Sequence, residues 1–289
     1  LQLSVWLICA VPFGNQGYAL DLEGEPPNYS QRKLHTKIQI ETVSLLAWSP
    51  GLNRGYIPQG VTLIGQEIFL SAYRQGGEGP KCMIFRLDSA TGQTLGEHAV
   101  GEYCSHAGGL AYTDSGRLFL SDTRRLYEIS LENTRRSKSG FAEIIHTWEL
   151  RFPLNGSFSA ANITGLWGGV FSKPKPGVLY RIPWSMLNDN KEDLRTSDTD
   201  HTIEIFPASQ GGCFDKEDNL WLSQSTSQYG RIQKVEWTSG RVIKEYQMMA
   251  GIEDLGCGAE GKIWSVSEAG SPRWSNWETF YPVVFSVQF

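Results

Sequence analysis

The segment HAGGLAYTDSGRLFLSD, residues 106–122, carries the pattern that decides the fold. It begins with small residues, passes through a short polar stretch, and continues as an alternating apolar run that ends in Ser and Asp. Alternation with a period of two on either side of a Gly-containing polar stretch is typical of two antiparallel strands. The segment therefore predicts a β-hairpin whose first strand is packed too closely for bulky side chains.

The same plan recurs along the chain about every 50 residues, as repeat architectures do. Four further copies share it: IPQGVTLIGQEIFLSAY (57–73), SAANITGLWGGVFS (159–172), SQGGCFDKEDNLWLSQS (209–225) and EDLGCGAEGKIWSVSEA (253–269). A second pair of alternating segments follows most copies, for example CMIFRLDSATGQTLGEHAV (82–100). Units of four strands at this spacing are typical of the blades of a β-propeller.

The two ends of the repeat region predict how the ring closes. The last unit has only one further strand, PVVFSVQF (282–289), whereas IQIETVSLLAW (38–48) stands alone before the first unit. An N-terminal outer strand that completes the last blade would remove an open sheet edge. We therefore expect an all-β protein, a single five-bladed β-propeller domain over residues 38–289, preceded by an N-terminal extension over 20–37.

The first residues are typical of an export signal. Residues 1–14, LQLSVWLICAVPFG, are almost entirely apolar, and Gly17-Tyr18-Ala19 offers small residues for cleavage. The prediction is a signal peptide over residues 1–19 and a secreted or periplasmic protein; the alternative is a buried strand or helix of the mature fold.

The cysteines fit an exported protein. Four lie beyond the predicted signal peptide: Cys82, Cys104, Cys213 and Cys257. An even number suggests two disulfides, and three pairings exist. We favour Cys82–Cys104 and Cys213–Cys257, because the repeat brings each pair close. Four buried free thiols are the alternative.

The composition argues against two classes of partner, nucleic acids and membranes. The net charge is −5, so a nucleic-acid binder that relies on a broad basic surface is not expected. No apolar run is long enough to span a bilayer, so stable membrane insertion is not expected either. The sequence does not identify a protein partner.

Candidate site residues follow from the propeller geometry. The start of the first strand and the end of the second strand of each blade converge on one mouth of the central channel, and these positions are polar here. The candidate catalytic residues are His106, Asp122 and Glu268. The candidate ligand-binding residues are Gln59, Tyr73, Arg74, Asn162, Gln210, Gln224, Glu253, Asp254, Trp274 and Trp277.

Three chemistries compete for this mouth. His106 with Asp122 or Glu268 could act as a general acid–base pair. Asp122, Glu253, Asp254 and Glu268 could hold calcium or another divalent cation, and no cofactor is predicted with certainty. The third is recognition of a small polar or carbohydrate ligand. The structural alternative is that these groups cap strand ends, and that Trp274 and Trp277 are a packing plug instead of an aromatic wall.

No nucleophile elbow, phosphate-binding loop or zinc-binding helix motif occurs. The leading hypothesis is therefore an exported propeller that binds a small polar or carbohydrate ligand. One alternative is a hydrolase, lyase or cyclotransferase that uses His106 with an acidic partner, with or without a metal. The other is a protein-interaction scaffold.

A run of motifs from about Tyr56 onward resembles a known family. In order, it comprises YIPQG (56–60), SAY (71–73), HAGG (106–109), LWGGVF (166–171), QGG (210–212), LSQS (222–225) and SEAG (267–270). This order resembles a family of secreted bacterial β-propeller proteins, which implies a five-bladed extracytoplasmic propeller and supplies no reaction or catalytic residues. A more distant similarity, through the Gln-Gly-Val opening, is to glutaminyl cyclotransferase-like five-bladed propellers. Their later EGWGL-like element is not evident here.

Overall fold

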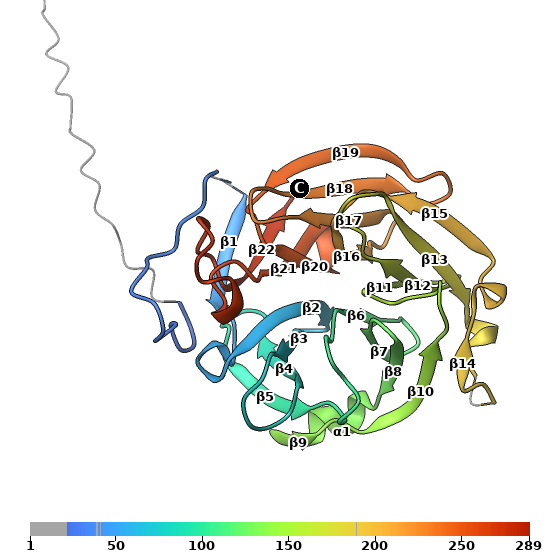
Figure 1. Ribbon diagram of the computed structural model, residues 1–289, viewed down its shortest axis with the longest axis horizontal. Helices are drawn as coiled ribbons and strands as arrows, with labels where there is room; N and C mark the ends of the chain where they lie inside the picture. Colours follow the sequence, from blue (N-terminus) through green and yellow to red (C-terminus); the bar gives the residue numbers. More distant parts are fainter. Residues whose placement is uncertain (1–21, 39, 41, 189) are drawn as a thin grey trace, which may run out of the picture.

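The strands form five sheets arranged around a central axis (Figure 1). The structure is a computed structural model that describes residues 22–38, 40, 42–188 and 190–289. Each sheet contains four consecutively hydrogen-bonded antiparallel strands, so the five-bladed β-propeller expected from the repeats is confirmed. The predicted signal peptide, residues 1–19, lies outside the described residues.

The blades follow one another along the chain, each running from the axis outward. Blade 1 contains β2 (Tyr56–Ile64), β3 (Glu67–Arg74), β4 (Cys82–Asp88) and β5 (Thr94–Ala99). Blade 2 contains β6 (Gly109–Tyr112), β7 (Leu118–Asp122), β8 (Arg125–Ile129) and β10 (Ile144–Leu150). Blade 3 contains β11 (Phe158–Asn162), β12 (Gly165–Val170), β13 (Gly177–Pro183) and β15 (His201–Ile205). Blade 4 contains β16 (Ser209–Phe214), β17 (Leu220–Ser225), β18 (Gly230–Glu236) and β19 (Arg241–Met248).

Blade 5 is built from both ends of the repeat region. It contains β20 (Ile252–Cys257), β21 (Lys262–Ser267), β22 (Val283–Gln288) and, outermost, β1 (Val43–Trp48). β1 pairs antiparallel with β22, from Val43 opposite Val287 to Trp48 opposite Val283. The predicted N-terminal closing strand is therefore confirmed.

Two insertions add short parallel strands to the outer edges of blades. The helix α1 (Leu131–Arg136) leads to β9 (Ser139–Phe141), which pairs with β5. The segment after β13 contributes β14 (Asp193–Leu194), which pairs with β10 of blade 2. These additions cover edges that would otherwise offer free backbone donors and acceptors.

Apolar side chains fill the spaces between neighbouring blades. Five buried clusters occur, and each draws its members mainly from two adjacent blades. Trp167 of blade 3, for example, is fully buried in one cluster with Leu222 of blade 4. The hydrophobic core is thus a ring of interfaces, and opening the ring at any one blade would expose two of its apolar faces.

Glycine is required where the innermost strands crowd together. A Cβ on Gly211 of β16 would lie 2.2 Å from the Cα of Asp254, and one on Gly109 of β6 would lie 2.6 Å from the backbone nitrogen of Ser159. These contacts confirm that glycines line the axis because larger residues do not fit.

Three innermost strands contain an irregularity near their start, where the pairing with the second strand of the blade shifts in register. The pairing register shifts between Pro58 and Val61 in β2, between Ser209 and Gly211 in β16, and between Ile252 and Leu255 in β20. An extra residue in a strand turns neighbouring side chains out of strict alternation, and such bulges are common beside active sites. The residues spanned by these shifts include the candidate site residues Gln59, Gln210, Glu253 and Asp254.

Both predicted disulfides are present. Cys82–Cys104 connects the start of β4 to the loop before β6, and Cys213–Cys257 joins the innermost strands of blades 4 and 5. Disulfides are typical of proteins that fold outside the reducing cytosol. Among the described residues, no helix is long and apolar enough to cross a membrane.

Removing the second disulfide is expected to destabilise the ring. The variant Cys213→Ser/Cys257→Ser should lose about 2 to 4 kcal/mol of unfolding free energy, because the bridge closes a loop of 44 residues. Urea unfolding with and without dithiothreitol measures this, with Cys82→Ser/Cys104→Ser as the matched variant. Equal unfolding midpoints for wild type and variant under oxidising conditions would contradict the prediction.

Candidate functional site

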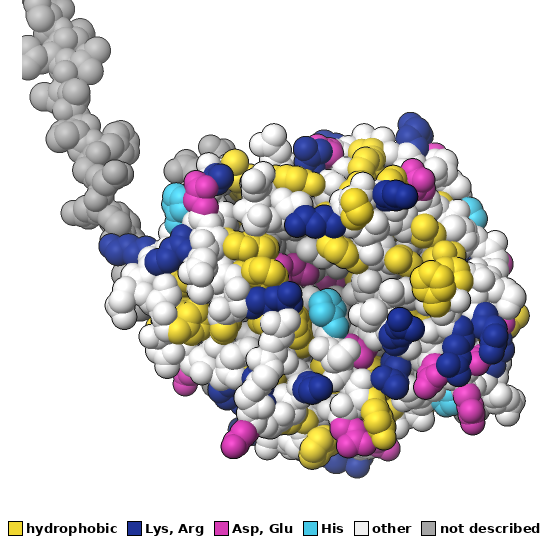
Figure 2. All heavy atoms as spheres, in the orientation of Figure 1, with side chains coloured by type: hydrophobic (Ala, Val, Ile, Leu, Met, Phe, Trp, Pro, Cys, Tyr) yellow, Lys and Arg dark blue, Asp and Glu magenta, His cyan; other side chains and the backbone are white. Residues whose placement is uncertain are grey.

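A cluster of polar side chains lies at the mouth of the channel where the innermost strands begin. β2 and β20 supply Gln59 and Glu253, the ends of β3 and β21 supply Tyr73 and Glu268, and the segment after β21 supplies Trp274. In Figure 2, acidic side chains and a histidine lie near the centre of the visible face, with lysines, arginines and apolar side chains around them.

Two buried carboxyl groups form the centre of this cluster. The side chains of Glu253 and Glu268 are within hydrogen-bonding contact of each other, and both residues are buried, at 2% and 8% exposure. Burial and the neighbouring Glu268 hold the pKa of Glu253 well above its usual range. Burial also raises the pKa of Glu268, to about 7, although hydrogen bonds from Trp274 and Glu253 oppose the rise. The pair therefore shares a proton near neutral pH, with Glu253 as the donor.

The ionised carboxylate is held by donors from two other segments. The indole nitrogen of Trp274 donates to Oε2 of Glu268 over 2.6 Å, and the amide nitrogen of Gln59 approaches the same oxygen at 3.4 Å. Trp277 stacks on Trp274 with ring centroids 4.8 Å apart. Trp274 thus holds the carboxylate in place and also forms part of an aromatic surface beside it. The loop therefore has features of both predicted roles, the aromatic wall and the packing plug.

Sequence reasoning missed Arg273, which connects the carboxyl pair to His106. Its guanidinium donates to the Tyr73 hydroxyl and lies 4.4 Å from the Trp274 ring. Tyr73 in turn lies against the His106 imidazole, with ring centroids 4.8 Å apart. The sequence feature that could have identified Arg273 is its position next to Trp274 in the 270–282 insertion.

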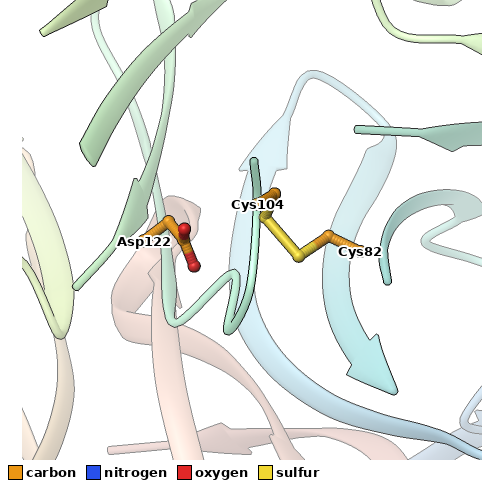
Figure 3. A group of neighbouring side chains, drawn as sticks. All are labelled: Cys82, Cys104 and Asp122. Carbon is orange, nitrogen blue, oxygen red and sulfur yellow. A yellow bond between two sulfur atoms is a disulfide. The ribbon is translucent and has the colours of Figure 1, made fainter. Parts of the chain in front are cut away.

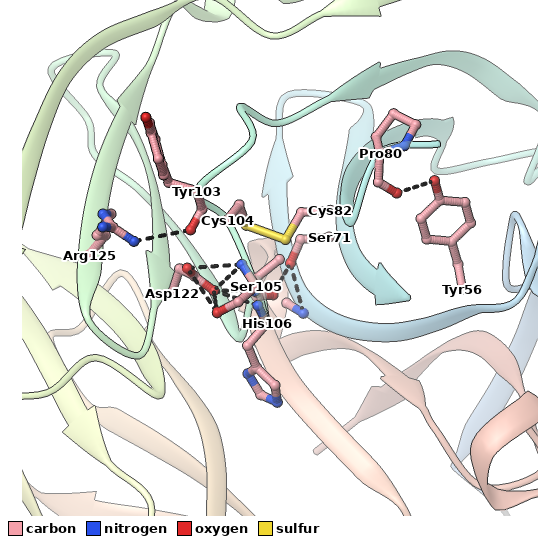
Figure 4. Close-up of a disulfide and its surroundings, with 12 residues drawn as sticks. Tyr56, Ser71, Pro80, Cys82, Tyr103, Cys104, Ser105, His106, Asp122 and Arg125 are labelled. Carbon is pink, nitrogen blue, oxygen red and sulfur yellow. Dashed lines mark hydrogen bonds between the residues drawn. A yellow bond between two sulfur atoms is a disulfide. The ribbon is translucent and has the colours of Figure 1, made fainter. Parts of the chain in front are cut away.

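His106 is a neutral ring without a hydrogen bond to a carboxylate. Burial lowers its pKa, partly offset by Asp122, and its Nδ1 atom is buried and unpartnered. Figure 4 shows the imidazole turned away from Asp122. The contact between the two residues is made by the His106 backbone, whose N–H donates to Oδ1 of Asp122 over 2.5 Å.

Asp122 has a structural role in the loop that carries His106. Its carboxylate also accepts the backbone N–H groups of Ser105 and Ala107, at about 3.0 Å each. Ala107 has a φ of 50°, an uncommon conformation that these bonds help to hold. The carboxyl groups that meet are therefore Glu253 and Glu268, and Asp122 is a positioning residue for the His106 loop.

Asp254 closes the axis below the carboxyl pair. It is fully buried, and its carboxylate accepts backbone N–H groups from three other blades: Val61 at 3.1 Å, Leu110 at 3.0 Å and Gly212 at 3.0 Å. Burial raises its pKa to about 8, against the amide donors, which favour the ionised form. One side chain thus joins the innermost strands of four blades.

In the described part of the chain, the other predicted residues make no hydrogen bond to Glu253 or Glu268. The Arg74 guanidinium donates to the Glu78 carbonyl and lies over the Tyr56 ring, and the Gln224 amide donates to the Pro207 carbonyl over 2.7 Å. Gln210 lies at the bulge of β16.

The predicted position of Asn162 was wrong. Asn162 is the last residue of the innermost strand β11, not near its start, and therefore lies at the opposite end of the channel. The third repeat is the least regular of the five, so its strand boundaries were misplaced.

The four carboxylates suggested for calcium do not form one site. Asp122 and Asp254 are each occupied by backbone donors, and Glu253 and Glu268 share a proton, whereas calcium takes six to eight oxygens. Among the described residues, one group has the proximity for a metal: Cys82, Cys104 and Asp122 (Figure 3). Its sulfur atoms are joined in a disulfide and therefore do not offer thiolates.

The N-terminal extension fastens the loop that carries Arg273, Trp274 and Trp277. Arg32 donates to the carbonyls of Ser275 and Trp277, over 2.8 and 2.7 Å, and the Tyr29 hydroxyl donates to that of Gly270 over 2.9 Å. The extension is therefore part of the support of the site.

Comparisons with known proteins agree with the fold. No protein-family model and no curated protein sequence matches the chain. Among solved structures, glutaminyl cyclase of Myxococcus xanthus is similar with a TM-score of 0.57 and 12% identity, covering 85% of this chain and 95% of that one. A luciferin-regenerating enzyme has a TM-score of 0.49 and 11% identity, covering 81% and 92%. The similarity to glutaminyl cyclotransferase-like propellers is thereby confirmed at the level of the fold.

Proposed function

We propose that this protein is an exported enzyme that carries out general acid–base catalysis on a small polar substrate at the Glu253–Glu268 mouth. The observation that carries the proposal is the buried carboxyl pair, in which one group is protonated and the other ionises near pH 7. A paired acid and base with pKa values moved apart is the usual arrangement for proton transfer in both directions.

The surroundings of the pair favour a substrate with a donor group. Glu268 offers a carboxylate already oriented by Trp274, and an amine or amide N–H could donate to it. The Trp274–Trp277 stack offers an apolar surface for the rest of the substrate. His106, neutral and against Tyr73, contributes to the wall of the mouth in this proposal.

Cyclisation of an N-terminal glutamine is the first reaction to test, since glutaminyl cyclase shares the fold. In that reaction the α-amino nitrogen bonds to the side-chain amide carbon, and the bond from that carbon to the amide nitrogen breaks to release ammonia. The amine loses a proton and the leaving nitrogen gains one. Glu268 would accept the first proton, and the pair would return one to the leaving group.

The test uses short peptides that begin with glutamine, and the same peptides beginning with asparagine as the matched control. Mass spectrometry should show loss of one ammonia from the glutamine peptides only, at a rate above the uncatalysed one. If no ammonia is lost and the peptides cause no Glu268-dependent thermal shift, the proposal is wrong.

Binding without turnover is the second candidate, favoured by the small exposure of the pair. It predicts that the peptides raise the melting temperature while remaining unchanged in mass. The variant Glu268→Gln should then abolish the thermal shift, because the orienting carboxylate is lost.

A further inference from the structure

The opposite end of the channel holds a cavity separate from the carboxyl pair. It has a volume of about 870 Å³ and is lined by the ends of all five innermost strands, among them Thr62, Leu110, Asn162, Gly212 and Cys257. Small-molecule sites usually measure about 300–1,000 Å³, so the cavity is large enough for a ligand of one or two rings.

The cavity ends at the level of Asp254. The backbone N–H groups of Leu110 and Gly212, two lining residues, donate to the Asp254 carboxylate across the axis. The cavity is therefore a pit with Asp254 at its base, and neither Glu253 nor Glu268 is among its lining residues.

The charged groups along the wall are mainly acidic, and most of them already have hydrogen-bond partners within the protein. Arg117 makes two hydrogen bonds to Glu128, at 2.8 and 2.7 Å, and Asp218 accepts from Asn162 at 2.9 Å. Asp114 and Lys216, which are exposed, have opposite signs. A third lining acid, Asp215, accepts from the Asn219 amide and the Trp221 indole. The lining therefore has more acids than free bases, which disfavours an anionic ligand, whereas the hydroxyl groups of a neutral ligand can donate to these carboxylates.

The remaining lining groups suit a neutral ligand with hydroxyl groups. Trp184 lines the cavity and is fixed there, because its ring stacks on Phe119 at 5.9 Å and its indole nitrogen donates to the Asn162 carbonyl over 3.2 Å. Tyr112 adds a second aromatic ring, and Thr62 and Thr113 supply hydroxyls. Fixed aromatic surfaces with few well-placed polar groups are typical of binding sites, and the apolar faces of sugar rings pack on such surfaces.

The wall is also held rigid. The disulfide Cys213–Cys257 joins two lining strands, and both of its cysteines border the cavity. A site that is formed before the ligand arrives avoids the entropic cost of ordering its side chains. From this geometry we infer that the pit is a second binding site, for a neutral mono- or disaccharide.

The experiment titrates the protein with glucose, maltose, trehalose and sucrose by isothermal calorimetry and saturation-transfer NMR. Glucosamine and gluconate are the charged comparisons. We expect saturable binding of at least one neutral sugar, weakened at least tenfold in Ala161→Trp, which places a large ring on the lining. Thr238→Trp, on the exposed turn between β18 and β19, is the control for adding a tryptophan and should bind as wild type.

Two further variants keep the result interpretable. Trp184→Leu should weaken sugar binding if Ala161→Trp does not fold. Glu268→Gln, at the other mouth, should leave sugar binding unchanged, which separates this inference from the proposed enzyme activity. The inference is overturned if no neutral sugar binds saturably, if a charged analogue binds more tightly, or if binding survives both cavity variants.

Discussion

Asp254→Ala is expected to lower the free energy of unfolding by about 3 to 5 kcal/mol. The substitution removes the acceptor of three buried backbone N–H groups, from Val61, Leu110 and Gly212. Each buried donor left without a partner costs about 1 to 3 kcal/mol, and part of that cost is recovered if water enters the space. The three donors come from three different blades, so the loss should affect the whole ring.

Urea denaturation followed by tryptophan fluorescence measures this change. Asp114→Ala, at an exposed turn residue, is the matched control and should stay within about 0.5 kcal/mol of wild type. Asp254→Asn keeps the shape and one oxygen, so it provides a folded reference if Asp254→Ala does not fold. A free energy of unfolding for Asp254→Ala within 1 kcal/mol of wild type would show that the carboxylate does not hold the blades together.

Glu268→Gln is expected to reduce turnover of the substrate found in the peptide test by about 10²- to 10⁴-fold, the usual contribution of a general acid or base. The amide can still accept from Trp274 but cannot take up a proton. Glu253→Gln should have a comparable effect while preserving the hydrogen bond to Glu268, because an amide can donate as the protonated carboxyl does. The exposed Glu217→Gln is the control and should leave the rate unchanged.

The same pair predicts a pH dependence of stability. The pKa of Glu268 is about 7 in the folded protein and near its ordinary value of 4.5 in the unfolded chain. Between these two pKa values the folded state binds more protons than the unfolded chain. The contribution of Glu268 to stability is therefore full below about pH 4.5 and declines as the pH rises toward 7.

Unfolding free energies measured from pH 5 to pH 8 test this directly. Wild type should lose stability relative to Glu268→Gln across that range, because glutamine removes the ionisation. Two parallel curves would show that the carboxyl of Glu268 is not perturbed. Turnover in wild type should instead rise with pH through about 7, as Glu268 becomes the base.

The fold could be predicted because the sequence repeats it. Alternation, polar turns and close-packing glycines recur in every unit, and each is a local property of the chain. The third unit shows the limit of this reasoning: its glycines follow Asn162 and not the start of the strand, so strand alternation alone placed Asn162 at the wrong end of β11.

The site was only partly predictable, since its chemistry depends on irregular strand pairing within blade 5 and on contacts between blades. The sequence predicts Glu253 and Glu268 as polar residues at strand ends but not the contact between them, and Glu253 lies in the irregular part of β20. Two adjacent acids, Glu253 and Asp254, have different roles: one meets a carboxyl at the mouth and the other binds amides on the axis. The sequence contains no signal for that division, which depends on strands far away in the chain.

The two-ended construction of blade 5 has a consequence for biogenesis. β1 is synthesised first, and its partner β22 follows only after four complete blades have been made. Until then β1 is unpaired, and the apolar faces of blades 1 and 4 that will contact blade 5 are exposed. Such exposed surfaces favour aggregation or binding by a chaperone. Gln59 of blade 1 approaches Glu268 of blade 5, so this part of the site is assembled only when the ring closes. Activity would thus report completed folding, and a nascent or C-terminally truncated chain would be inert.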